Sequence, residues 1–114
     1  MGLFITLRSG DGDVVRQIAD PLGGTFDASG DFDELLGSEV SPRLNRVDPE
    51  GSTILSSSEM SEISVEVDAL LRTIPDDARS HGRQGQAWRG LVRFQAMVEL
   101  CAADDRSSLL FTGD

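Results

Sequence analysis

The chain has 114 residues, 39% of them hydrophobic, and a formal net charge of −10 at pH 7. This length predicts a single domain over residues 1–114, and the charge argues against binding to DNA, RNA or an anionic membrane. Because the sequence has no long apolar run and its first residues lack a basic segment, we expect neither a transmembrane helix nor a signal peptide.

The residue types that are scarce limit the chemistry further. The sequence has one cysteine (Cys101), one histidine (His81) and no lysine, so all ten basic residues are arginine. A lone cysteine cannot form an internal disulfide, which favours a reducing cytoplasm. A single histidine excludes a two-histidine metal site within one chain, and the lack of lysine excludes a P-loop or Schiff-base lysine. We therefore expect no cofactor and no metal, and favour a binding protein over an enzyme.

The N-terminal segment predicts a strand followed by a short helix. Residues 2–8 (GLFITLR) alternate between apolar and other side chains, as a strand does. Residues 9–13 (SGDGD) are typical of a turn. Residues 14–20 (VVRQIAD) predict a short N-terminal helix, because Val14, Val15 and Ile18 share one helical face and Pro21 follows.

An acidic segment follows, with weak secondary-structure signals. Residues 27–34 (DASGDFDE) place Asp27, Ser29, Asp31 and Asp33 at alternate positions, as an EF-hand loop places its oxygen ligands, but the glycine and the final glutamate of that loop are not in place. A weak calcium loop and an acidic surface loop are the two interpretations, and we favour the second. Its carboxylates are well placed to meet a basic protein, so the predicted partner-binding residues are Asp27, Asp31, Asp33, Glu34 and Glu39.

Residues 43–60 (RLNRVDPEGSTILSSSEM) carry several turn and helix-start signals. Residues 48–51 (DPEG) match a type I turn, and the runs RLNRV and STIL on each side read as strands, so we expect a β-hairpin over 43–55. Ser56 and Glu59 form a capping box, flanked by Leu55 and Met60 as a hydrophobic staple. A catalytic or phosphate-binding serine is the alternative, but no glycine-rich loop or base lies nearby in the sequence.

Two amphipathic helices and a last strand complete the predicted elements. The first helix follows Ser56 and ends at Pro75, with apolar residues at steps of three and four; the second runs from Gln84 or Gln86 to Ala103 after a polar linker. Residues 107–114 (SSLLFTGD) predict a terminal strand. We expect a two-layer α+β fold, in which one mainly antiparallel sheet of about four strands is covered on one face by two main helices and the short N-terminal helix. The first and last strands are candidates to lie side by side.

Two side-chain groups have both a chemical and a structural interpretation. Cys101 and His81 are the residues available for a cysteine dyad, but Cys101 lies on an apolar stripe, which favours a buried, inert thiol. Five arginines between residues 72 and 93 either bind phosphate or an acidic partner, or pair with the surplus acids of the first fifty residues; we favour pairing. They are Arg72, Arg79, Arg83, Arg89 and Arg93.

The stretches RVDPEGSTIL, MSEISVEVDALL and LLFTGD resemble a loose group of small, uncharacterised bacterial proteins. These combine an R-I/V-D-P-x-G-x-T hairpin with a following helix and end in F-x-G-D; the resemblance covers roughly residues 43–114. Glu50 and Ser52 differ from the aromatic and acidic residues of that pattern. The resemblance implies a bacterial source and a compact α+β fold, and it supplies no functional residues.

Two classes of function are compatible with these features. The first is a small, acidic, cytoplasmic protein-binding module, such as an immunity or inhibitor protein that docks on a basic partner. The second is a small-ligand-binding or enzymatic domain that uses carboxylates and arginines of the hairpin and of the 76–87 linker. The oligomeric state is not predictable from these patterns.

Overall fold

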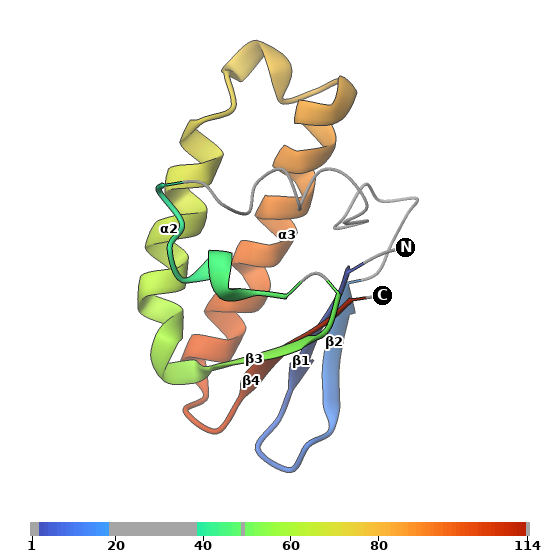
Figure 1. Ribbon diagram of the computed structural model, residues 1–114, viewed down its shortest axis with the longest axis vertical. Coiled ribbons are helices and arrows are strands. Elements are labelled where there is room, and N and C mark those ends of the chain that lie inside the picture. Colours follow the sequence, from blue (N-terminus) through green and yellow to red (C-terminus); the bar gives the residue numbers. More distant parts are fainter. Residues whose placement is uncertain (1–2, 19–38, 49, 114) are drawn as a thin grey trace.

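The structure is a computed structural model that describes residues 3–18, 39–48 and 50–113. A four-stranded antiparallel sheet has the order β2-β1-β4-β3, and two helices, α2 and α3, lie on one face of it (Figure 1). This confirms the predicted two-layer α+β fold. The strands are β1 (Leu3–Arg8), β2 (Val14–Ile18), β3 (Ser52–Ser56) and β4 (Ser108–Gly113); the helices are α2 (Met60–Arg72) and α3 (Gly82–Ala103).

The prediction of a short N-terminal helix is wrong, because Val14–Ile18 form strand β2, which pairs with β1. Gly12 adopts a φ of +86°, which glycine tolerates readily, and the turn it makes brings the chain back against β1. Valine and isoleucine favour extended backbone, and an isolated segment of this length is too short to hold a helix without tertiary support. The pairing with β1 therefore decides the conformation.

The predicted β-hairpin over 43–55 is half right. Its second strand is β3, but the first is replaced by a 3-10 helix, η1 (Leu44–Arg46). Leu44 and Val47 are three residues apart and both buried, a spacing that suits a helical turn better than an alternating strand. The turn at 48–51 keeps its expected bonds, since Gly51 N–H donates to the Asp48 carbonyl and the Asp48 carboxylate accepts Glu50 N–H at 2.9 Å.

Both main helices are confirmed with shifted bounds. The first ends at Arg72, with Ile74 and Pro75 just beyond it, and the second begins at Gly82 rather than at Gln84 or Gln86. The linker between them also contains a short 3-10 helix, η3 (Asp76–Ala78). No helix in the described ranges is both long and apolar enough to cross a membrane.

The core lies between the helices and the inner face of the sheet. Phe94 of α3 packs edge-on against Phe111 of β4, with ring centroids 5.8 Å apart. Ile5 and Leu7 of β1 and Leu55 of β3 point to the same side and are buried. As expected, the terminal strands are neighbours: β1 pairs with β4, and Leu3 lies opposite Gly113. The sheet thus brings the ends of the described chain together (Figure 1).

Candidate functional site

The hydroxyl-rich segment at 56–59 begins a helical run, as the capping box predicted. Ser56 is the N-cap of a short 3-10 helix, η2 (Ser57–Glu59), which leads directly into α2. The Glu59 carboxylate accepts the Ser56 N–H at 3.0 Å, and the Ser56 hydroxyl takes part in the reciprocal half of the box. Leu55 and Met60, the two residues of the predicted staple, are both buried. The Ser57 hydroxyl donates to the Cys101 carbonyl at 2.8 Å, and the Ser58 and Ser56 hydroxyls lie 2.9 Å apart, so these serines have structural partners.

A buried carboxylate on α2, that of Glu66, holds the start of η1. Glu66 is 7% exposed, and its Oε1 accepts the backbone N–H groups of Arg43 at 2.9 Å and of Leu44 at 3.0 Å. Groups at a helix N-terminus have no partner within the helix, so a carboxylate from a neighbouring element satisfies them. Sequence reasoning missed this role. The one available signal was an acid on the apolar stripe between Ile63 and Leu70.

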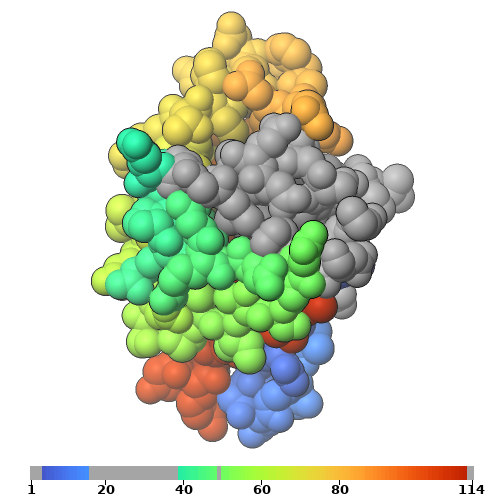
Figure 2. Space-filling view, viewed as in Figure 1, coloured from blue at the N-terminus to red at the C-terminus, as the bar shows by residue number. Residues whose placement is uncertain are grey.

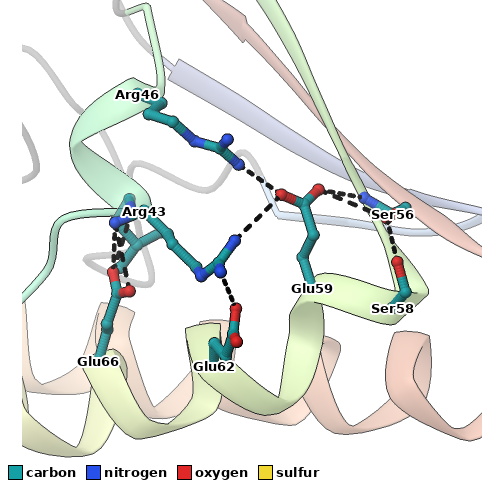
Figure 3. Close-up of polar contacts among 8 residues, drawn as sticks. Arg43, Arg46, Ser56, Ser58, Glu59, Glu62 and Glu66 are labelled. Atoms are coloured by element: carbon teal, nitrogen blue, oxygen red, sulfur yellow. Dashed lines mark hydrogen bonds and ion pairs between the residues drawn. The ribbon is translucent and has the colours of Figure 1, made fainter.

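Arginine side chains from the η1 segment extend the same contact along α2 (Figure 3). Arg43 forms ion pairs with Glu62 and with Glu59, the latter at 3.7 Å, and Arg46 forms a second ion pair with Glu59. The backbone bond to Ser56, followed by the bond to Arg46, holds the pKa of Glu59 below its ordinary value. The network thus joins η1, the end of β3 and the start of α2, and its geometry is that of a structural clasp.

Most of the predicted partner-binding acids cannot be placed. Asp27, Asp31, Asp33 and Glu34 lie outside the described residues, as does the EF-hand-like stretch 27–34. Glu39 is described and is exposed. Their role remains a prediction.

The described residues do bring together acids that the sequence alone did not connect. The β1–β2 turn (9–13) and the α3–β4 turn (104–107) lie side by side at one end of the molecule, where a Cβ added to Gly10 would come within 2.7 Å of the Arg106 Cβ. Figure 2 shows both turns at the lower end, in blue and red. We call the carboxylates on them the acidic end: Asp11, Asp13, Asp104 and Asp105.

The arginines of these turns leave most of that charge uncompensated. Arg8 donates to the Gly12 carbonyl rather than to a carboxylate, and Arg106 lies 3.9 Å from Asp104. Asp11, Asp13 and Asp105 are exposed. An end with more carboxylates than cations suits contact with a basic surface.

The hypothesis of a catalytic dyad of Cys101 and His81 is wrong, because the two residues lie at opposite ends of α3. His81 is the N-cap of α3, and Cys101 lies near the other end of the same 22-residue helix, about 30 Å away at 1.5 Å per residue. Cys101 is fully buried, and burial raises the pKa of its thiol to about 11, with a smaller contribution from the charge of Asp104. As expected for the structural alternative, the thiol is a core group.

The arginine-rich region between the helices finds a partner close by in sequence. Arg79 pairs with Asp76 at 2.6 Å, donates to the Ile74 carbonyl and stacks over the Trp88 ring, 3.9 Å from its centroid. Among the described residues, Arg79 therefore pairs with a nearby acid, and the expectation that the arginines pair with acids of the first fifty residues stays a prediction. The ion pair forms locally because η3 places Asp76 one helical turn before Arg79.

The described residues do not bring together the two segments named in the ligand-binding or enzymatic alternative. That hypothesis needs the 43–55 segment and the 76–87 linker to face one site, but η1 lies beside the middle of α2 while the linker lies beyond its far end (Figure 1). Within the described ranges, no group of three or more histidine, cysteine or acidic residues is arranged to hold a metal.

Comparison with protein-family models, with curated proteins and with solved structures found no match for this chain. The resemblance to the group of small bacterial proteins stays a prediction.

The buried carboxylate of Glu66 should contribute far more to the free energy of unfolding than the exposed carboxylate of Glu62. Glu66→Ala removes the acceptor for two backbone N–H groups at the start of η1, and we expect it to lower the free energy of unfolding by roughly 2–4 kcal/mol. Glu62→Ala, one turn earlier on α2, breaks a surface ion pair and should change it by less than about 1 kcal/mol. Urea denaturation of both variants measures this. Equal losses would contradict the structural role of Glu66.

The Glu59 clasp should weaken in acid. Because its folded-state pKa lies below the ordinary 4.5, the clasp stabilises the protein fully above that pH and loses its effect as the pH falls through the lowered value. The difference in unfolding free energy between the wild type and Glu59→Gln should therefore be larger at about pH 7 than at about pH 3. Glu99→Gln, an exposed change on α3, provides the matched control. A difference independent of pH would refute the clasp.

The Cys101 thiol should be unreactive in the folded protein. At pH 8 a pKa of about 11 leaves about one thiol in a thousand ionised, and the sulfur is also buried. A thiol reagent such as Ellman's should label it slowly under native conditions and stoichiometrically in concentrated urea. Rapid native labelling would show that the thiol is accessible and would reopen a reactive role.

Proposed function

We propose that this chain is a small acidic protein-binding module that docks on a basic protein. The observation that carries the proposal is the acidic end, where two turns distant in the sequence place Asp11, Asp13, Asp104 and Asp105 together. Turns are exposed and carry little of the packing, so their charges are free to face a partner. The predicted acids at 27–34 and Glu39 would contribute further negative charge to the encounter with a basic partner.

The overall charge supports the same direction of binding. The net charge is −10, and the first fifty residues contribute −6 of it, from ten acids and four arginines. Charge of this kind acts mainly on the rate of association, because it steers an oppositely charged protein during diffusion. It equally disfavours the phosphates of nucleic acids and anionic lipids.

Within this class, we favour an immunity or inhibitor protein acting in the cytoplasm on a nuclease-type enzyme. A nuclease needs a basic surface for the phosphates of its substrate, and an acidic protein of this size can cover such a surface. The single cysteine, which is free and buried, suits a reducing compartment.

The test is the salt dependence of association with a captured partner. The partner is isolated with the tagged full chain, and its association rate is measured by stopped-flow mixing at increasing ionic strength. Between about 50 and 500 mM salt the rate should fall more than about tenfold, because screening shortens the range of the attraction. The free protein should also fail to bind duplex DNA at physiological salt; tight binding there would refute the charge argument.

Two charge-neutralising triple variants locate the surface. One changes Asp31, Asp33 and Glu34 to their amides, and the other changes Asp11, Asp13 and Asp105. A third variant, which neutralises Glu50, Glu62 and Asp77 elsewhere on the surface, makes the same change in net charge and is the control. At least one of the first two should slow association well beyond the control and leave stability nearly unchanged. An association rate that changes neither with salt concentration nor in any of the three variants would refute the proposal.

A further inference from the structure

Strand β3 forms one edge of the sheet, and half of its backbone groups point away from β4. In an antiparallel pair, alternate residues exchange hydrogen bonds with the partner strand and those between them face outward. Ser57 N–H donates to the Ser107 carbonyl at 3.2 Å, so Thr53 and Leu55 share its orientation toward β4. The backbone groups of Ser52, Ile54 and Ser56 therefore face outward.

One of these outward groups is occupied, whereas those of Ile54 have no hydrogen-bond partner among the described residues. The Ser56 N–H donates to Glu59, which closes that end of the edge. In the described part of the chain, no hydrogen bond engages the outward N–H and C=O of Ile54. The Ile54 side chain is 62% exposed on the face of the sheet opposite the helices. Figure 2 shows the segment that contains β3, in green, on the surface of the molecule.

The edge also lacks the features that keep sheet edges apart. Natural edge strands are commonly protected by charge, proline or a bulge. Residues 51–58 (GSTILSSS) contain no charged residue and no proline, whereas the other edge strand, β2, contains Arg16. An exposed, uncharged edge with free backbone groups is suited to pairing with another strand.

We propose that β3 pairs with β3 of a second copy of this chain, antiparallel about Ile54, to make one continuous eight-stranded sheet across a two-fold axis. The strand is close to self-complementary in this register, because Ser-Thr-Ile-Leu-Ser places Ile54 opposite Ile54 and Ser52 opposite Ser56. The Ile54 residues exchange two backbone bonds, and Ser52 N–H with Ser56 C=O supplies two more. The two exposed Ile54 side chains then cover each other, as an isologous interface requires.

A second copy is a suitable partner because each chain has a net charge of −10, and the uncharged edge is a surface where two such chains can come into contact. The two negatively charged chains repel each other, and salt screens this repulsion. The dissociation constant of the dimer should therefore fall as ionic strength rises. Binding to a basic partner responds in the opposite direction. The inference therefore does not depend on the proposed function, and the two fail separately.

Sedimentation equilibrium of the purified chain, from micromolar to about 1 mM, tests the proposal. We expect a concentration-dependent mass that rises from 12.3 kDa toward twice that value, and a dissociation constant that falls as salt is raised from about 50 to 500 mM. The amide exchange of Ile54 should slow with protein concentration, while that of Leu55, bonded within the monomer, should not change. A monomer under all these conditions would overturn the proposal.

Matched variants decide whether this edge is the interface. Ile54→Lys should raise the dissociation constant at least about tenfold, because it places two like charges opposite each other. Val65→Lys, on α2, changes an equally exposed aliphatic residue by the same charge and should weaken the dimer little or strengthen it. Ser52→Pro removes an outward N–H that has no partner among the described residues of the monomer, and should also weaken the dimer. Circular dichroism checks that each variant is folded. A dimer that persists in both edge variants would show that another surface is used.

Discussion

The fold depends on the pairing of the last strand with two earlier ones. Strand β4 lies in the middle of the sheet, between β1 from the start of the chain and β3 from its middle. Without it the sheet separates into the β1–β2 hairpin and a single strand, and two-stranded hairpins are marginal in water. The core follows the same constraint, since Phe111 of β4 packs on Phe94 of α3 and Leu109 is buried beside it. Such long-range pairing makes loop closure a condition of forming the sheet.

Hydrogen bonds and ion pairs also connect the start of the helical layer to residues 43–56, which precede it. Two carboxylates about two helical turns apart, Glu59 and Glu66, accept backbone N–H groups from Ser56 and from the start of η1. Arg43 and Arg46 then bridge the same surfaces. These bonds position η1 so that Leu44 and Val47 enter the core. The hydroxyls and charges at 43–60 are thus explained by structure.

The parts of the fold that were predictable are those set by local signals. The capping box at Ser56, the apolar stripes of both helices and the terminal strands rest on spacings of two, three or four residues, and each is confirmed. The segments 14–18 and 43–47 were assigned wrongly because their apolar residues are few and fit more than one period. Strand β2 is decided by pairing with β1, and η1 is decided by the Glu66 carboxylate, which lies more than twenty residues away in sequence. The acidic end has the same origin, since only the register of the sheet places residues 11–13 beside 104–106.

Charge is distributed over the described surface according to what each element does. The clasp between η1 and α2 and the 76–79 turn hold most of the described ion pairs, so these charges are largely neutralised locally. The turns at the acidic end have carboxylates in excess, whereas the β3 edge has no charge over eight residues. A charged turn and an uncharged strand edge favour different kinds of contact, because the first acts at a distance and is screened by salt, and the second acts through short-range hydrogen bonds and apolar contact. The β3 edge runs along one side of the sheet and the acidic turns close one end of the molecule. A partner at the end therefore need not displace a second chain at the edge.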